Sequence, residues 1–183
     1  MNDQSAAVQI APISPVFGAE VHGVDLADGI DDQTFETVHR AWLEHGVLAF
    51  RGQTALTAEA QVEFARRLGP LHAHPAAPAE HENAAVFVIR THRDSPISNG
   101  NGWHSDVSCD EEPPSATMLQ VQLLPDGGGG DTLFADMEAA YATLPPATRQ
   151  RLCVLSAEHA SAHVYPGRYA DRGADEVAVD TPS

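Results

Sequence analysis

Hydrophobic residues recur every three or four positions in two stretches of the first third of the chain. Residues 31–45 show this spacing and predict a helix that Asp31 or Asp32 caps. A second predicted helix is capped by Thr57 and runs to Leu68. Both helices are expected to pack one face against a core. The side chains expected on those faces are Phe35, Val38, His39, Trp42 and Leu43 in the first helix, and Val62, Ala65 and Leu68 in the second.

Elsewhere the hydrophobic pattern favours short strands separated by turns. Residues 8–26 alternate loosely between prolines and glycines, and residues 47–50 form a short apolar run. Two short helices are expected later, one over 137–144 capped by Asp136 and one from Pro145 to Leu152. Further strands are expected at 85–89, 116–124, 131–134 and 154–163. Many short strands with few helices indicate a mainly β domain with flanking helices, either a sandwich or a barrel.

Composition narrows the class of protein. A length of 183 residues fits one domain. The net charge of −16, with only 10 Lys and Arg, argues against binding to nucleic acid or to anionic membranes. The sequence shows neither an apolar run long enough to cross a bilayer nor a secretory signal, and its two cysteines fit a reducing compartment. We therefore expect a cytoplasmic protein, and whether it forms a homo-oligomer stays open.

The sequence contains two His-x-Asp triplets, His92-Arg93-Asp94 and His104-Ser105-Asp106. With 10 His and 26 Asp plus Glu in 183 residues, about 1.4 His-x-acid triplets are expected by chance, so the pattern alone is weak. The second triplet follows the aromatic Trp103 and precedes Pro113-Pro114 and a predicted strand. The first triplet lies in a polar stretch typical of a loop. The sequence context therefore favours the second triplet.

His104 and Asp106 are two residues apart, and side chains at that spacing point to the same side of an extended chain. One divalent metal can then bind an imidazole nitrogen and a carboxylate oxygen from a single segment. This is two thirds of the 2-His-1-carboxylate face, which binds non-haem Fe(II) and leaves positions open for oxygen and a co-substrate. Two alternatives remain: a metal-free β-sandwich binding module in which the pair only hydrogen-bonds across a turn, and a cupin-type metal hydrolase or isomerase with His92 as a further ligand.

Further motifs stand in a fixed order around the second triplet. They are Phe17–Leu26, Leu71-His72-Ala73-His74-Pro75, Pro113-Pro114, Gly129-Gly130-Asp131-Thr132-Leu133-Phe134 and Ala157-Glu158-His159. Together with Trp103–Val107, their order and spacing resemble the TauD/TfdA family of Fe(II)- and 2-oxoglutarate-dependent dioxygenases, and its taurine dioxygenases in particular. The resemblance covers nearly the whole chain and joins several separate motifs, so it is far more specific than one triplet.

The resemblance implies a double-stranded β-helix, the clavaminate synthase-like jelly roll. Residues 1–165 would be the N-terminal portion of that domain, incomplete at its C-terminal end, and residues 166–183 a disordered tail. It further implies that His104 and Asp106 bind Fe(II), and that Thr132 helps to hold a carboxylate of the co-substrate 2-oxoglutarate. The family's second His ligand and its 2-oxoglutarate-binding Arg are absent from their expected places. His159 and His163 are the remaining, weak candidates for the ligand.

The resemblance also implies a substrate class. It places His74, Asn101 and Trp103 around a small substrate, and an imidazole suits an anionic group. An aromatic residue of the taurine pocket is replaced by Ala77. The expected reaction is hydroxylation by O2 of a small, anionic, taurine- or alkylsulfonate-like molecule.

Overall fold

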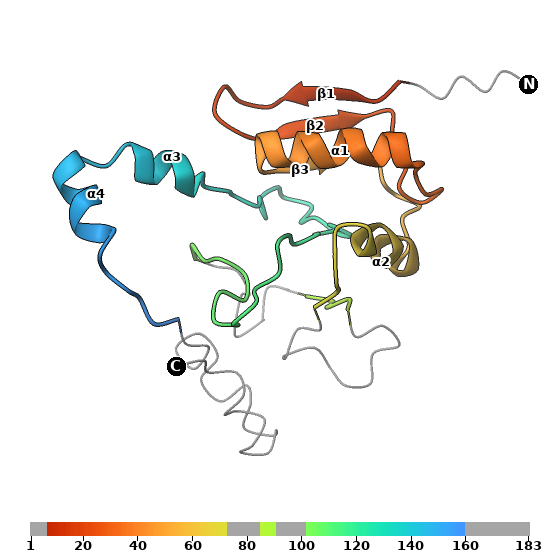
Figure 1. The fold of residues 1–183 in the computed structure, drawn as a ribbon. Coiled ribbons are helices and arrows are strands. Elements are labelled where there is room, and N and C mark those ends of the chain that lie inside the picture. The colour runs from red at the N-terminus through yellow and green to blue at the C-terminus, as the bar shows by residue number, and fades with distance from the viewer. Residues whose placement is uncertain (1–6, 73–84, 91–101, 160–183) are drawn as a thin grey trace, which may run out of the picture. The chain divides into compact units, whose positions relative to one another are not determined.

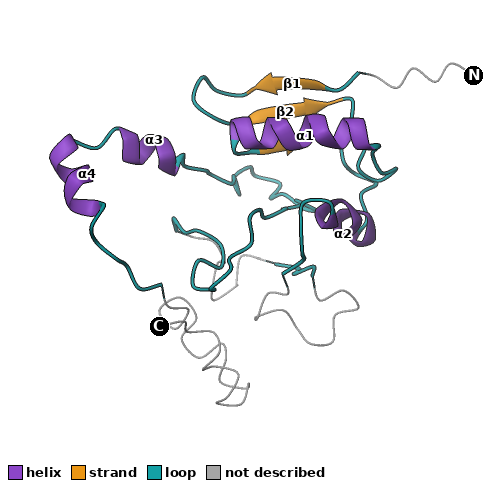
Figure 2. Cartoon of the chain, viewed as in Figure 1, coloured by secondary structure: helices purple, strands orange, loops and turns teal. Residues whose placement is uncertain are grey.

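A computed structural model describes residues 7–72, 85–90 and 102–159 (Figures 1 and 2). The chain divides into two units. The first unit consists of Met1–Phe64 and Leu119–Leu155, and the second of Ala65–Met118 and Ser156–Ser183. Among the described residues, no helix is both long enough and apolar enough to cross a membrane.

A three-stranded sheet lies at the centre of the first unit's core. Strand β1 (Gln9–Pro12) pairs antiparallel with β2 (Ala19–His22), and β2 pairs parallel with β3 (Leu48–Phe50). The central strand β2 alternates buried and less buried side chains, with Ala19 and Val21 facing the core. These strands confirm the predictions for residues 8–26 and 47–50.

Helix α1 (Asp32–His45) runs alongside this sheet (Figure 1). Its N-cap is Asp31, whose carboxylate accepts a hydrogen bond of 2.7 Å from the Thr34 amide. The helix ends at Gly46, which has a φ of 71° and donates its N–H to the Trp42 carbonyl. The structure thus confirms the helix and selects Asp31 over Asp32 as the cap.

Replacing Asp31 with alanine is expected to destabilise the first unit by about 1 kcal/mol, because one amide of the first turn loses its acceptor. Asp32→Ala is the matched control, since that carboxylate lies in the first turn, where it interacts with the helix dipole. The free energy of unfolding is measured in urea. Equal losses for the two variants would show that Asp31 does not act as the cap.

Helix α2 (Ala58–Arg66) completes the core of the first unit. The Thr57 hydroxyl accepts a hydrogen bond of 3.2 Å from the Ala60 amide, as expected of a cap. The rings of Phe35 and Phe50 each lie 6.1 Å from the ring of Phe64 in an edge-to-face arrangement. The buried apolar side chains are Ala19, Val21, Leu26, Val38, Ala41, Leu56, Val62 and Phe64.

The helix faces differ from the predicted ones in part. Leu43 was expected in the core but is 68% exposed. Ala41 faces the core instead. Leu43 follows two residues later and is therefore rotated by about 200° around the helix axis, away from the core. In α2 the structure buries Phe64, which was not expected inside, together with Val62. His39 stacks on Phe35 with ring centroids 5.8 Å apart, so its role is packing, as predicted.

Two short helices follow in the first unit, as the sequence predicted. Helix α3 (Met137–Ala142) is capped by Asp136, which accepts from the Ala139 amide at 2.9 Å. Helix α4 (Pro146–Leu152) begins with a proline in its first turn, where no amide proton is needed. Before them, Gly128, Gly129 and Gly130 have φ values of 80°, 93° and 77°, which only glycine adopts readily in succession.

Four of the predicted strands are not formed in the described residues. They are those at 85–89, 116–124, 131–134 and 154–163, of which only 154–159 is described. A β-strand is defined by hydrogen bonds to a neighbouring strand, and no described segment pairs with any of these four stretches. Side chains at 114–121 nevertheless alternate between half-buried and exposed, as in a strand covered on one face. Leu119, Val121 and Leu123 stand on its exposed face.

This uncovered apolar face is expected to make the isolated chain self-associate. The triple variant Leu119→Thr, Val121→Thr and Leu123→Thr should raise the monomer fraction measured by size-exclusion chromatography with light scattering. The control is Ile13→Thr with Val16→Thr, which removes exposed apolar groups elsewhere. A gain of the same size in the control would rule out this face as the cause.

Candidate metal site

His104 and Asp106 lie in the second unit, on a loop rather than on the expected extended segment. Immediately after them, Val107 has a φ of 49°, a left-handed conformation that β-branched residues rarely adopt. The Asp110 amide donates to the Val107 carbonyl at 3.1 Å and closes the turn. Such strain costs about 1–3 kcal/mol and often marks functional loops.

The loop brings the His104 and Asp106 side chains together. The His104 Nε2 atom lies 3.1 Å from the Asp106 Oδ1 atom, and the two side chains are 53% and 44% exposed. The convergence that the two-residue spacing predicted is therefore present, although a turn rather than a strand produces it. Both groups remain accessible to a ligand from solvent.

The hydrogen bonds of His104 determine which atoms face Asp106. Its Nδ1 atom lies 2.7 Å from the Gly102 carbonyl oxygen, which can only accept, so Nδ1 carries a proton. In the neutral ring, Nε2 then presents a lone pair to the carboxylate. A bridging proton or a metal ion between Nε2 and Oδ1 accounts for their approach to 3.1 Å.

The separation of these two atoms fits a divalent metal. Metal–ligand bonds of about 2.1 Å at a right angle place two ligand atoms about 3 Å apart. A neutral imidazole oriented by a backbone carbonyl is also the usual form of a metal-binding histidine. The donor set of one imidazole nitrogen and one carboxylate oxygen suits Fe(II).

A third protein ligand is not found in the part of the chain that the structure describes, where no cluster of three or more His, Cys, Asp or Glu side chains could hold a metal. His159 places its Nδ1 atom 3.0 Å from the Ser108 hydroxyl oxygen. His163, the other candidate, lies outside the described residues.

Two of the other predicted site residues are described. Trp103 precedes His104 directly and is exposed. Thr132 belongs to the first unit, follows the glycine turn and is also exposed. His74, Asn101 and the triplet beginning at His92 lie outside the described residues.

One contact beside the site was missed by the sequence analysis. The His72 Nε2 atom lies 2.7 Å from the Asp110 Oδ2 atom. The two residues are 38 positions apart, and no local spacing links them. The sequence analysis used His72 only as part of the motif Leu71-His72-Ala73-His74-Pro75, and it did not single out Asp110.

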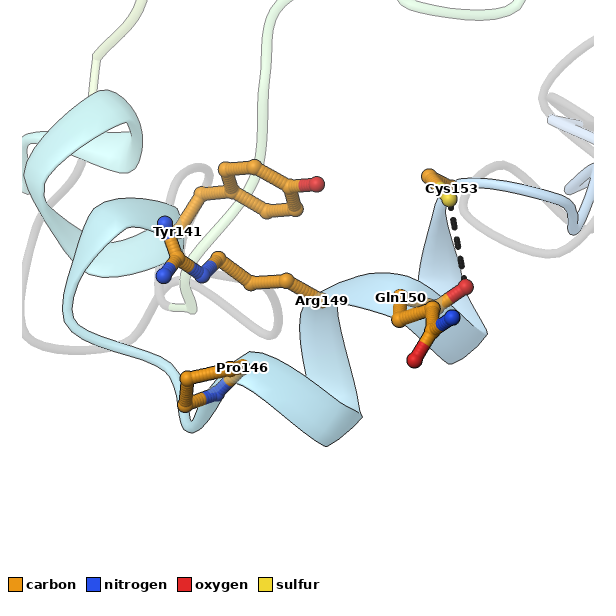
Figure 3. A pocket seen from close by; sticks show the side chains of 5 residues that line it. All are labelled: Tyr141, Pro146, Arg149, Gln150 and Cys153. Carbon is orange, nitrogen blue, oxygen red and sulfur yellow. Dashed lines mark hydrogen bonds between the residues drawn. The ribbon is translucent and has the colours of Figure 1, made fainter.

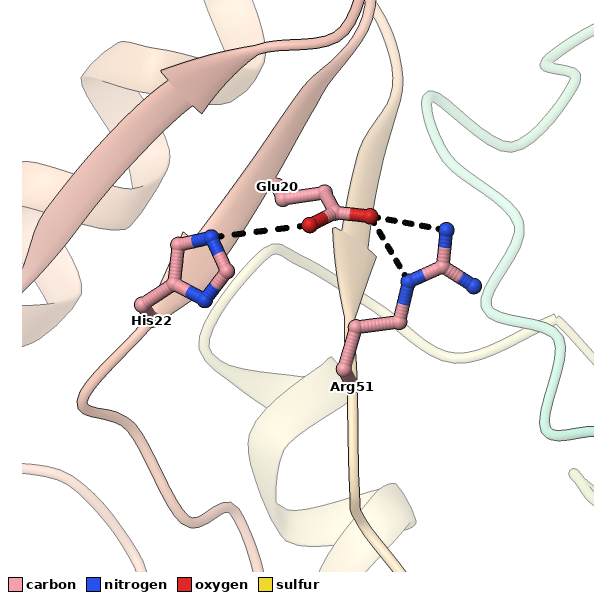
Figure 4. Close-up of polar contacts among 3 residues, drawn as sticks. All are labelled: Glu20, His22 and Arg51. Atoms are coloured by element: carbon pink, nitrogen blue, oxygen red, sulfur yellow. Dashed lines mark hydrogen bonds and ion pairs between the residues drawn. The ribbon is translucent and has the colours of Figure 1, made fainter.

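Two other polar features lack the characteristics of a metal site. On β2, Glu20 accepts from Nε and Nη2 of Arg51 at 2.8 Å each and lies 3.5 Å from His22 (Figure 4). Ion pairs near the surface, such as these, stabilise the folded protein by at most about 1 kcal/mol. An open pocket of about 290 Å³ lies between α3 and α4, where Arg149 reaches toward Tyr141 (Figure 3). Its lining contains no His, Asp or Glu.

Comparison with known proteins assigns the chain to a family. The profile described as "Taurine catabolism dioxygenase TauD, TfdA family" matches residues 9–181. The chain therefore belongs to the TauD/TfdA family, and the resemblance inferred from its motifs is confirmed.

Individual relatives are about one third identical to the chain over the aligned residues. It is 33% identical to an alkylsulfatase of Acinetobacter baylyi, covering 87% of the chain and 49% of the relative. It is 34% identical to an alpha-ketoglutarate-dependent sulfate ester dioxygenase of Pseudomonas putida, covering 86% and 51%.

A solved structure shows the same relationship. The crystal structure of a taurine dioxygenase from Burkholderia xenovorans superposes with a TM-score of 0.65 at 30% identity, over 84% of this chain and 53% of that one. The chain thus shares the fold of a TauD-type dioxygenase, a jelly-roll class, over the matched region, and it spans about half the length of these relatives.

Proposed function

We propose that the chain is the N-terminal part of an Fe(II)- and 2-oxoglutarate-dependent dioxygenase, with His104 Nε2 and Asp106 Oδ1 as two of its iron ligands. The observation that carries the proposal is the 3.1 Å approach of these atoms, with the His104 ring oriented by the Gly102 carbonyl. Family membership supports the choice of Fe(II) over other divalent metals.

The proposed architecture is a double-stranded β-helix to which this chain contributes one portion. The sheet of β1, β2 and β3 with its helices is part of that portion. The half-buried alternation at 114–121 suits a further strand that pairs when its neighbours are present. The remaining iron ligand and the arginine for 2-oxoglutarate then come from outside the described residues.

When bound, Fe(II) supplies the oxidative chemistry that converts 2-oxoglutarate, O2 and a C–H bond into succinate, CO2 and an alcohol. His104, through Nε2, and Asp106, through Oδ1, are the residues that would hold the metal. Thr132 is proposed to donate its hydroxyl proton to a carboxylate of 2-oxoglutarate. A guanidinium is the group best suited to hold that carboxylate in two-point fashion.

The proposed substrate is a small organic sulfate ester or sulfonate. Relatives named alkylsulfatase, sulfate ester dioxygenase and taurine dioxygenase support this class. A chain with a net charge of −16 needs a local donor or positive group to bind an anion. The imidazole of His74 is the proposed group, with Asn101 and Trp103 beside the substrate.

Succinate formation from 2-oxoglutarate tests this function. In the full-length protein to which this chain is proposed to belong, with Fe(II) and O2 present, a short alkyl sulfate should stimulate succinate formation, and the alcohol of the same carbon chain should not. His74→Ala should raise KM for the sulfate at least tenfold because a charge-assisted hydrogen bond is lost. His22→Ala, an exposed histidine on β2, is the control. Stimulation by the alcohol but not by the sulfate would contradict the proposed substrate class.

A further inference from the structure

A second histidine–carboxylate pair joins Asp110, four residues after Asp106, to His72. The His72 Nε2 and Asp110 Oδ2 atoms are 2.7 Å apart, closer than the 3.1 Å between His104 and Asp106. The His72 and Asp110 side chains are 27% and 22% exposed, about half the exposure of the first pair. This pair is therefore the more buried and the more tightly joined of the two.

The chemistry of the His72–Asp110 pair makes it a strong local tie. An ionised carboxylate can only accept, so His72 donates its Nε2 proton to Asp110. A charge-assisted bond of this length is roughly twice as strong as a neutral one. Removing His72 would leave the half-buried Asp110 carboxylate without this partner. The resulting loss of folding free energy is larger than the loss on breaking an exposed ion pair.

The contact acts on the loop that carries the metal-binding pair. Asp110 is joined through its amide to the Val107 carbonyl at 3.1 Å. Val107 holds its left-handed φ of 49° directly after Asp106. Because that conformation is unfavourable for valine, surrounding contacts must maintain it. The bond from His72 to Asp110 is one of these contacts.

A second tie holds the same turn. The Ser108 hydroxyl lies 3.0 Å from His159 Nδ1, so side chains from two distant segments anchor residues 108 and 110. Unlike the His72–Asp110 pair, this contact is exposed and uncharged on the serine side. It is therefore expected to contribute less to the conformation of the turn.

We propose that His72 and Asp110 are positioning residues, which hold the Val107 turn so that the Asp106 carboxylate stays opposite the His104 ring. This inference rests on the proposed function, because it gives the pair a role in metal binding rather than in stability alone. Without the pair, Val107 relaxes toward negative φ and the Asp106 carboxylate moves away from His104. Loss of such support commonly lowers metal affinity about 10- to 100-fold.

Mn(II) titration of the 183-residue chain, followed by the EPR signal of free Mn(II), tests the proposal. His72→Ala and Asp110→Asn should each raise the Kd for Mn(II) about tenfold. The double variant should bind Mn(II) no more weakly than His72→Ala alone, because His72→Ala already removes the contact that Asp110→Asn weakens. His72→Gln, whose amide can donate to Asp110, should restore most of the affinity. His22→Ala removes a histidine paired with Glu20 at 3.5 Å and should leave the Kd unchanged.

The outcomes separate this inference from the function on which it rests. If His104→Ala and Asp106→Ala weaken Mn(II) binding while the His72 and Asp110 variants bind like wild type, the positioning role is overturned and the proposed metal site stands. If no variant at His104 or Asp106 affects binding, both fail. Circular dichroism at the titration temperature identifies any unfolded variant. If His72→Ala unfolds, the question is decided by Asp110→Asn and His72→Gln, which keep a polar group of similar size.

Discussion

Replacing His104 with alanine is expected to raise the Kd of the chain for Mn(II) about 100-fold or more, and Asp106→Ala should do the same. Each change removes one of the two atoms that lie 3.1 Å apart and are proposed to bind the metal. Loss of a ligand is expected to cost at least as much as the loss of a group that only orients a ligand. The EPR signal of free Mn(II) measures the effect.

Non-specific binding needs a control, because the chain carries a net charge of −16 and will attract any divalent cation. Glu44→Gln removes an exposed carboxylate from α1 and should leave the specific Kd unchanged. Asp106→Asn keeps the size of the side chain and should weaken binding nearly as much as alanine does. Wild-type affinity in both His104→Ala and Asp106→Ala would remove the basis of the metal site.

Replacing Phe64 with alanine is expected to destabilise the first unit by about 3–4 kcal/mol. The Phe64 ring is buried and packs edge-to-face against Phe35 and Phe50 at 6.1 Å, so alanine leaves a cavity beside the sheet. Leu43→Ala should change the free energy of unfolding by less than about 0.5 kcal/mol, because Leu43 is 68% exposed.

Urea unfolding followed by far-ultraviolet circular dichroism measures both variants. This comparison also decides between two assignments of the α1 and α2 faces, since the hydrophobic pattern placed Leu43 inside and did not single out Phe64. A loss for Leu43→Ala as large as that for Phe64→Ala would favour the pattern over the structure.

The parts of the fold that depend on nearby residues could be predicted from the sequence. The cap at Asp31 or Asp32 and the cap at Asp136 were predicted from contacts within four residues, and the structure has both, the first at Asp31. Helix faces were less predictable, because the position of Leu43 depends on where the sheet lies. The spacing of apolar residues contains no information on that position.

Strands depend on partners that are distant in the sequence, and this explains the strand predictions that were wrong. Residues 116–124 have the composition of a strand and alternate in exposure over much of their length, yet no described segment supplies hydrogen bonds to them. By contrast, β3 formed where predicted because β2 lies beside it in a parallel register, with Ala19 opposite Leu48.

The candidate site shows the same division between local and distant information. His104 and Asp106 could be selected because a two-residue spacing and a neighbouring aromatic are visible in the sequence. The turn that joins them, with Val107 at a φ of 49°, could not be predicted, since valine disfavours that conformation. The His72–Asp110 contact spans 38 residues and likewise required the structure.

Anaerobic titration with Fe(II) and 2-oxoglutarate tests the central claim most directly. A ferrous ion that binds 2-oxoglutarate gives a visible metal-to-ligand charge-transfer band. We predict this band for the wild-type chain and for Glu44→Gln, and its loss in His104→Ala and in Asp106→Ala. A band that persists unchanged in both alanine variants would contradict the assignment of His104 and Asp106 as iron ligands.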